Sequence, residues 1–353
     1  MTMRAAAGDT RAVLETFTSD DKIDVGICQA VGVEILQRYG VEADIAATVV
    51  DVLIDADKRG VTTHGLTRLP SYVKRIEAGL LDANARPQIL KDGETLVLLD
   101  GRNGFGAVAG VHATDLAAER AASLGLCWIT VKNSNHIGML AHYSLRLAQH
   151  GLVGIMLSNA GPAVAAFGGK RATLGTNPIS IAVPADNEPI ALDMATTVVA
   201  RGKIRRASAE GKSIAPGLAL DADGKPTTDA AAALKGTLAS IGGAKGYGLA
   251  VMIDLLSGLV SGGRFLTGVK QATDLTGNAG VSFTVIAADI TRISDAEHYS
   301  EGLQRFRSVI KQSGDPDTNI YLPGEIENER ARQAEREGIT VPKDVIESMK
   351  ALL

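Results

Sequence analysis

Hydrophobic residues recur every three to four positions through residues 22–60, which predicts two helices. The spacing is interrupted at residues 39–41, Tyr-Gly-Val, where the two helices join. The second helix runs into a polar stretch that is broken by Gly60, Gly65 and Pro70. We therefore expect a helix end followed by a more specialised segment.

Short stretches rich in valine and isoleucine alternate with helical patterns through the middle of the chain. A strand over residues 95–101, a helix over 111–125 and a strand over 127–134 form one such unit. Further strands are predicted at residues 151–159, 179–185, 189–196 and 281–289, with helices at 246–262 and 294–312 and a final charged helix ending at Leu353. This alternation predicts an α/β fold with a mixed or parallel sheet covered by helices.

Composition narrows the classes of function. The chain has 353 residues, enough for one large or two connected medium domains. Its formal charge of -4 and its 4% aromatic content provide no basic, stacking surface for nucleic acid, so we expect none as a partner.

The two cysteines and the hydropathy pattern bear on location. Cys28 and Cys127 have no paired spacing, so we expect neither a disulfide framework nor a metal site, and a cytoplasmic protein fits best. The N-terminal residues lack an apolar core of signal-peptide type, and no stretch of about 18 apolar residues follows. We therefore expect no membrane partner.

A glycine-rich segment after the first strand resembles a dinucleotide-binding loop. Gly104, Gly106 and Gly110 stand in GRNGFGAVAG, but the last interval is one residue too long. Such a loop also needs an acidic residue at the end of a second strand about 20 positions later, and here that region is helical. We therefore interpret these glycines as a turn or a close approach of two backbones.

Two segments carry histidines beside other polar groups. His64, Arg68 and Tyr72 lie four residues apart and would project from one side of a helix, where a base, a forked cation and a phenol suit a carboxylate beside a reacting hydroxyl. A surface helix with scattered polar groups is the alternative. His136 follows a strand among amide and hydroxyl side chains, which favours proton transfer, or else a structural turn.

Two further segments are candidates for ligand contacts. Thr176-Asn177-Pro178 precedes a strand, and Asp193 ends the next one, where it could pair with a histidine or cap a helix. Residues 242–248 bring glycines and Lys245 to the start of a helix, which suits the binding of a pyrophosphate or a carboxylate. The alternative is that these glycines serve helix packing alone.

Six segments occur together in a familiar order: THGLTRLPSY, NSNHIGMLAHYS, GTNPISIAVP, LDMATT, GGAKGYGLA and LPGE. With them, about residues 25 to 345 resemble the type 2 malate/L-lactate dehydrogenase family, whose members include sulfolactate and ureidoglycolate dehydrogenases and piperideine-2-carboxylate reductases. The resemblance implies a three-layer, mixed-sheet, non-Rossmann cofactor domain (residues 126–304). It would be inserted into a mainly helical substrate and dimerisation domain (1–125 and 305–353), in a homodimer.

The resemblance also implies roles for individual residues. Arg68 would grip a substrate carboxylate, with Tyr72 and Thr63 beside it. In one branch of the family, the acid-base residue is the histidine that corresponds to His136. In another branch, it is the histidine that corresponds to His64, paired with the aspartate that corresponds to Asp193. The implied cofactor contacts are Ser158, Thr176, Asn177, Pro178, Asp193, Met194, Ala195, Lys245, Gly324, Glu325 and Ile326.

The predicted function is hydride transfer between NAD or NADP and C2 of a small 2-hydroxy or 2-oxo acid of malate, lactate or sulfolactate type. No metal is expected. Reduction of a cyclic imino acid is one alternative, and a non-catalytic nicotinamide-binding dimer is another. The segment GRFLTGVKQATDLTGNAG (263–280) matches no motif and is a candidate to shape the substrate entrance.

Overall fold

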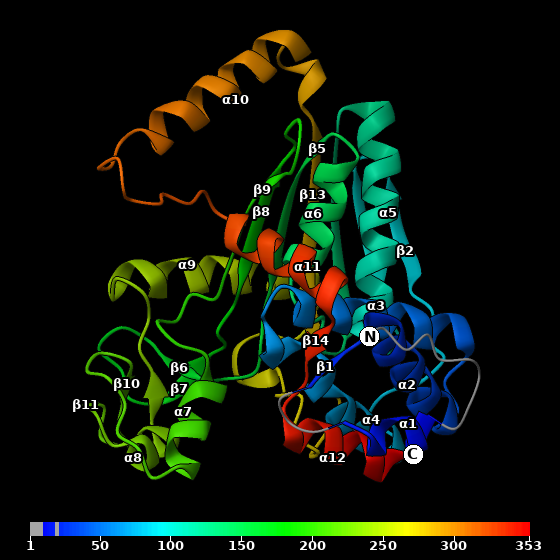
Figure 1. Ribbon diagram of the computed structural model, residues 1–353, viewed down its shortest axis with the longest axis vertical. Coiled ribbons are helices and arrows are strands. Elements are labelled where there is room, and N and C mark those ends of the chain that lie inside the picture. The colour runs from blue at the N-terminus through cyan, green and yellow to red at the C-terminus, as the bar shows by residue number, and fades with distance from the viewer. Residues whose placement is uncertain (1–9, 18–20) are drawn as a thin grey trace.

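The computed structural model describes residues 10–17 and 21–353 (Figure 1). A seven-stranded sheet runs through it in the order β2-β3-β4-β13-β5-β8-β9. The strands are β2 (Gln88–Gly93), β3 (Leu96–Asp100), β4 (Leu126–Ser134), β13 (Val281–Asp289), β5 (Leu152–Ser158), β8 (Ile179–Val183) and β9 (Ile190–Met194). Because β3 and β4 are parallel and the other neighbours are antiparallel, the sheet is mixed, as predicted.

The central strands of this sheet are covered on both faces. The first five residues of β13 are all buried, although successive side chains point to opposite faces. Helices α5 (Gly106–Leu124) and α6 (Ala141–Gln149) pack on the sheet, and so do α9 (Ala244–Asp254) and the π-helical turn η3 (Leu255–Leu259). The predicted layering of a mixed sheet with helices is therefore confirmed.

The two ends of the chain build one helical region (Figure 1). Its helices are α1 (Thr10–Glu15), α2 (Val25–Arg38), α3 (Ala43–Lys58), α4 (Leu69–Glu77), α11 (Glu325–Glu337) and α12 (Lys343–Leu352). Helix α1 contacts α12, and β1 (Lys22–Ile23) pairs with β14 (Ile339–Thr340). The helices at residues 22–60 are confirmed as α2 and α3, which are joined at residues 39–42.

A smaller lobe has its own sheet and core. Its sheet has the order β11-β10-β12-β6-β7, from β11 (Pro226–Thr227), β10 (Ala219–Leu220), β12 (Thr237–Leu238), β6 (Val164–Ala165) and β7 (Ala172–Leu174). Helices α7 (Arg201–Ala209) and α8 (Ala230–Lys235) pack together beside it, and the lobe buries a separate apolar cluster. Helix α10 (Ala296–Lys311) has no buried residue and stands at the top of Figure 1.

The predicted boundary between residues 125 and 126 falls between α5 and β4. Strand β3, before this boundary, pairs along its length with β4, after it. The division into domains stays a prediction. Within the described residues, no helix has both the length and the apolarity needed to cross a membrane.

The glycines of GRNGFGAVAG serve close packing. Helix α5 starts at Gly106, and a Cβ there would lie 2.4 Å from the carbonyl oxygen of His136. A Cβ on Gly110 would lie 2.6 Å from the ring of Tyr143. The interpretation as a close backbone approach is confirmed, and Gly106 seats α5 directly against the His136 segment.

We expect Gly106→Ala to lower the free energy of unfolding by about 1–3 kcal/mol, because the new methyl group meets backbone that cannot move alone. Gly302→Ala is the matched control, since Gly302 lies in exposed α10, where a Cβ would meet no heavy atom within 4 Å. The control should leave stability unchanged or raise it by up to about 1 kcal/mol. Urea titration followed by Trp128 fluorescence measures both, and equal effects would contradict the packing argument.

Candidate active site

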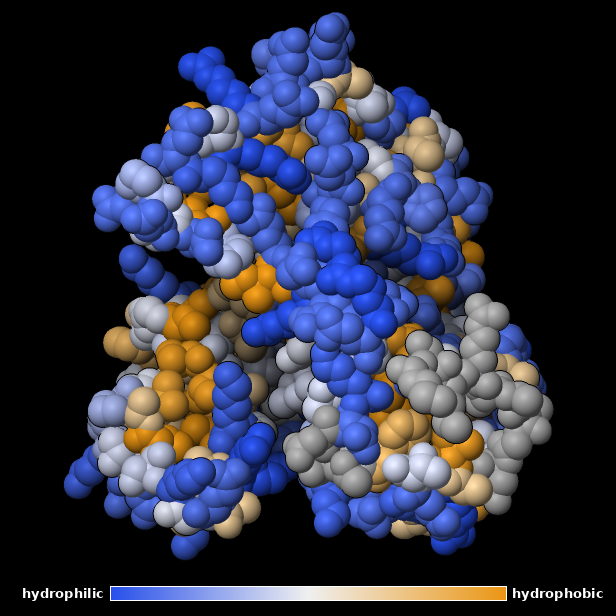
Figure 2. All heavy atoms as spheres, in the orientation of Figure 1, coloured by the Kyte–Doolittle hydropathy of each residue, from blue (hydrophilic) through white to orange (hydrophobic). Residues whose placement is uncertain are grey.

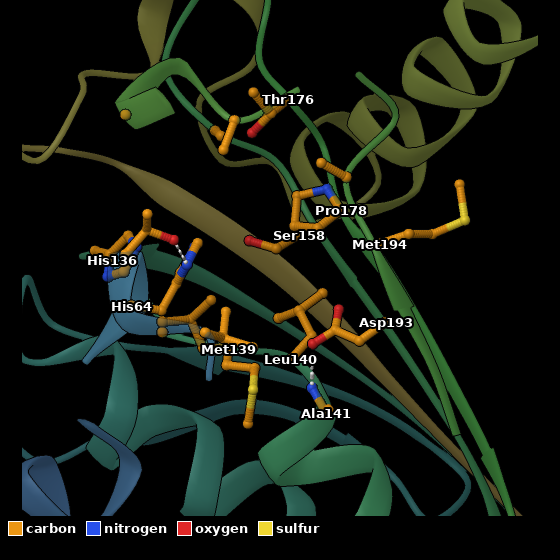
Figure 3. Close-up of a pocket in the computed structure, with 18 of the residues that line it drawn as sticks. His64, His136, Met139, Leu140, Ala141, Ser158, Thr176, Pro178, Asp193 and Met194 are labelled. Carbon is orange, nitrogen blue, oxygen red and sulfur yellow. Dashed lines mark hydrogen bonds between the residues drawn. The ribbon is translucent and has the colours of Figure 1, made fainter. Parts of the chain in front are cut away.

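A cavity of about 600 Å³ lies where the helical region, the large sheet and the smaller lobe meet. It is within the range of volumes seen for small-molecule and cofactor sites. Its wall comes from segments far apart in sequence, which include residues 61–68, 136–145, 158–163, 176–178, 191–195, 200–205, 270–273 and 323–328. Figure 3 shows part of this wall, with His64 and His136 together on one side and Asp193 and Met194 on the other.

Two histidines from different segments meet in this wall. The rings of His64 and His136 are stacked, with centroids 5.3 Å apart and an angle of 25° between planes. Like charges this close oppose each other, so the two imidazoles take up at most one proton readily. The sequence left open which histidine is the acid-base residue, and the structure places both at the same point of the cavity.

Burial keeps both imidazoles neutral. It lowers the pKa of His64 to about 3, with the charge of Arg68 acting in the same direction. It also lowers the pKa of His136 well below its ordinary value, assisted by Arg68 and His64. At neutral pH each ring therefore has one N–H and one nitrogen lone pair.

Tyr72 orients His136. The phenol oxygen lies 2.9 Å from Nδ1 of His136, and the Tyr72 side chain is buried. Burial raises the pKa of Tyr72, so the phenol keeps its proton. Among the described residues, His136 is the hydrogen-bond partner of this phenol. A buried hydroxyl that lacks an acceptor lowers the stability of the fold. Tyr72 therefore donates to Nδ1, and His136 carries its hydrogen on Nε2.

Thr63 orients His64 less strictly. Its Oγ1 lies 3.0 Å from Nδ1 of His64, and Thr63 itself is half-buried in the cavity wall. A threonine hydroxyl both donates and accepts, so either tautomer of His64 is satisfied. His64 can therefore present a lone pair on Nε2, which His136 does not.

Arg68 stands in the same wall with most of its donors free. Its Nε donates to the carbonyl oxygen of Thr63 at 2.6 Å, which fixes the guanidinium next to His64. Two short 3-10 turns, η1 (Thr62–His64) and η2 (Leu66–Arg68), bring these residues together instead of the single helix that the spacing suggested. The remaining N–H groups suit a carboxylate.

Asp57 of α3 supports this bend. Its Oδ2 accepts the backbone N–H of Leu66 at 2.8 Å, and burial raises its pKa to about 7. A Cβ on Gly65 would lie 1.9 Å from Oδ1 of Asp57, so the glycine allows the carboxyl to approach the chain. The turn that presents His64 and Arg68 is thus held from behind by the half-buried side chain of Asp57.

Asp193 caps a helix instead of contacting an imidazole. Its Oδ2 accepts the backbone N–H of Ala141, at the start of α6, at 2.8 Å (Figure 3). Burial raises its pKa to about 7, and this hydrogen bond opposes the rise. The sequence suggested that Asp193 pairs with a histidine or caps the helix that follows it. The described hydrogen bonds include no pairing with a histidine, and the helix that Asp193 caps is α6, which precedes it in the chain.

Most residues expected in the site line the cavity, and five do not. The lining includes Thr63, His64, Arg68, His136, Ser158, Thr176, Pro178, Asp193, Met194, Ala195 and Gly324. Tyr72 and Asn177 are buried behind the wall, where Asn177 bonds to Ala250 and Ala160. Lys245, Glu325 and Ile326 lie outside this wall. Their cofactor roles stay predictions.

The sequence-based interpretation missed several residues that line the cavity: Arg59, Arg201, Arg205, Glu327 and Asn328. Residues 270–273 also line it, so the unplaced 263–280 segment does reach the site, as suggested. The spacing of Arg201 and Arg205, one helical turn apart, was a usable signal, but basic residues at that spacing are common on exposed helices.

Comparison with known proteins agrees with this fold. A family model described as malate/L-lactate dehydrogenase matches residues 24–350. The chain belongs to this family. It is 34% identical to a malate/(S)-sulfolactate dehydrogenase of Methanothermus fervidus over 91% of this chain and 94% of that protein. It is 33% identical to a (2R)-3-sulfolactate dehydrogenase (NADP(+)) of Chromohalobacter salexigens, over 92% and 95%.

Solved structures show the same relationship. The sulfolactate dehydrogenase of Methanocaldococcus jannaschii superposes with a TM-score of 0.88 at 33% identity, and the match covers 94% of this chain and 96% of that one. The family and the type of enzyme predicted from the six ordered segments, a dehydrogenase of the malate/lactate type, are therefore confirmed.

Proposed function

We propose that this malate/L-lactate dehydrogenase family member transfers a hydride between NAD(P) and C2 of a small 2-hydroxy or 2-oxo acid. The observation that carries the proposal is the stack of two neutral histidines beside the half-buried guanidinium of Arg68 in one cavity. A carboxylate on Arg68 brings the neighbouring C2 oxygen within the reach of the imidazoles. The arrangement suits an acid whose reacting carbon adjoins its carboxylate.

The cavity fits a nicotinamide cofactor beside the substrate. Met139, Leu140, Pro178 and Met194 supply apolar surface for a flat ring, and Ser158 and Thr176 add polar groups. Gly324 has a φ of +89°, a conformation suited to glycine, and brings backbone to the cavity without a side chain. When bound, the cofactor supplies or accepts the hydride. The choice between NAD and NADP stays open in this proposal.

The chain's own residues handle the carboxylate and the proton. Arg68 binds the carboxylate and fixes C2 relative to the histidines, and such positioning provides a large share of enzymatic acceleration. In the oxidative direction, Nε2 of His64 takes the hydroxyl proton. In the reductive direction, the same nitrogen returns it to the oxygen on C2.

His136 has a different part in this proposal. Because Tyr72 occupies Nδ1, the Nε2–H of His136 donates a hydrogen bond to the C2 oxygen and stabilises negative charge that develops there. A neutral imidazole acting as a donor needs no proton from solvent. The low pKa values keep both imidazoles in the neutral forms from which these roles start in the oxidative direction.

The proposal is tested by following the absorbance of NADH and NADPH with a panel of 2-oxo acids and a cyclic imino acid. We expect oxidation of at least one cofactor by a 2-oxo acid. Turnover of the imino acid alone would establish the reductase alternative. Cofactor binding seen by fluorescence without turnover of any compound would establish a binding protein and overturn the proposal.

We also propose a homodimer. Helix α9 and the turn η3 expose an apolar stripe of Met252, Leu255 and Leu259, and Phe167 is 68% exposed. Figure 2 shows apolar side chains gathered on the lower left, over α9 and the smaller lobe. Exposed stripes of this kind mark interfaces, and light scattering of the purified protein tests the mass of the assembly.

A cytoplasmic location remains part of the proposal. Cys28 and Cys127 are both free and buried, which fits a reducing compartment.

A further inference from the structure

Helix α7 brings two arginines to the cavity that no predicted role uses. Arg201 and Arg205 lie one turn apart on the same side of α7, and both line the cavity. The helix approaches the turn that carries His64, since a Cβ on Gly202 would lie 3.5 Å from the methyl group of Thr63. The start of α7, which carries the two arginines, therefore lies next to the turn that carries Arg68.

These three guanidinium groups are not neutralised by protein carboxylates. Within residues 10–17 and 21–353, none of Arg68, Arg201 and Arg205 forms an ion pair. Arg68 and Arg201 each donate to a backbone carbonyl, whereas Arg205 has no described partner. Burial lowers the pKa of Arg68 and that of Arg201, and the charge of Arg205 acts on both in the same direction. The three guanidinium groups therefore share one electrostatic environment.

The neighbouring Arg206 is exposed like Arg205, but it has a protein partner and lies away from the cavity. It is 83% exposed, forms an i,i+4 ion pair with Glu210 and does not line the cavity. Unpaired cations gathered around a cavity repel one another, and an anionic ligand with more than one charge relieves that repulsion. One monocarboxylate on Arg68 leaves Arg205 without a partner.

We propose that Arg205 forms a second anion subsite, which binds the distal carboxylate or sulfonate of a dianionic 2-oxo or 2-hydroxy acid. The inference rests on the proposed function, since Arg68 binds the first carboxylate in it. Arg201, one turn away, lines the same end of the cavity. The enzyme then selects acids with a short, negatively charged tail over acids with an apolar one.

The test compares wild type, Arg205→Gln and Arg206→Gln with oxaloacetate and 3-sulfopyruvate as dianions and pyruvate and 2-oxobutyrate as monoanions. Wild type should favour a dianion. Arg205→Gln should lower kcat/KM for the dianions by about 10- to 100-fold, mainly through KM, because one charge-assisted hydrogen bond to the distal anion is lost. The monoanions should change by less than about twofold, and Arg206→Gln should match wild type throughout.

Three results would overturn the subsite. One is a wild type without preference for dianions, and another is an equal loss for both acid classes in Arg205→Gln. The third is a raised KM for NADH or NADPH in that variant, which would assign Arg205 to a cofactor phosphate. If no acid is turned over, the proposed function fails, and the subsite is then judged by calorimetric binding of succinate against butyrate. Tighter succinate binding that Arg205→Gln abolishes supports it, and equal binding overturns it.

Discussion

Replacing His64 with alanine is expected to slow hydride transfer from a 2-hydroxy acid by about 10²–10⁴-fold, because the reaction loses its proton acceptor. Replacing His136 with alanine should cost about 10²–10³-fold, the effect of losing one hydrogen-bond donor at the developing charge. Single-turnover absorbance at saturating cofactor measures both. His150→Ala, at an exposed histidine that bonds to Arg146, is the control and should react like wild type.

Glutamine variants separate the two roles. An amide donates a hydrogen bond but does not take up a proton at neutral pH. His136→Gln should therefore recover much of the rate lost in His136→Ala, whereas His64→Gln should be as slow as His64→Ala. The reverse pattern would exchange the roles of the two histidines, and near-normal rates in both alanine variants would remove the dyad from the chemistry altogether.

The pH profile gives an independent check. A base works in its neutral form, which is present above its pKa and is lost as the pH falls through it. Because burial lowers the pKa of His64 to about 3, kcat/KM for oxidation should show no acid limb at pH 6.5. The reductive direction needs a proton, so its kcat/KM should fall as the pH rises. An oxidative acid limb centred near pH 6.5 would show that the acting histidine is solvated.

Most of the fold could be predicted because its signals are local. The pattern at residues 22–60 reports a buried stripe on each of two helices, and the valine-rich stretches report buried strands. The order of those strands could not be obtained in this way. Strand β13 lies between β4 and β5, more than a hundred residues from either, and no local pattern records that pairing.

The site was predictable where residues act within one segment and less so where they act across segments. His64 and Arg68 share a short stretch of chain, so their proximity follows from spacing. The hydrogen-bond partner of Asp193 is a backbone N–H 52 positions away, which has no signature in the sequence. Asn177 was predicted as a ligand contact from its place in a turn before Pro178. In the structure it is buried and joins the backbone of Ala160, after β5, to that of Ala250 in α9.

Arg68 is expected to be the residue on which recognition of the acid depends most. Arg68→Ala should lower kcat/KM for a 2-oxo acid by about 10²–10³-fold, because a charge-assisted hydrogen bond to the carboxylate inside the cavity is lost. Arg68→Lys should restore little of this, since lysine has no fork and does not reproduce the bond from Nε to the carbonyl oxygen of Thr63. Added guanidinium salt should partly rescue Arg68→Ala but not Arg68→Lys.

A neutral substrate shows whether the effect lies in the carboxylate. Wild type should turn over a 2-oxo acid far faster than the matching 2-oxo amide, and Arg68→Ala should treat the two almost alike. If the variant lost activity toward acid and amide by the same factor, Arg68 would act by holding the turn from Thr63 to Arg68 in shape. Arg68 would then be a positioning residue, and the carboxylate contact of the proposed function would be wrong.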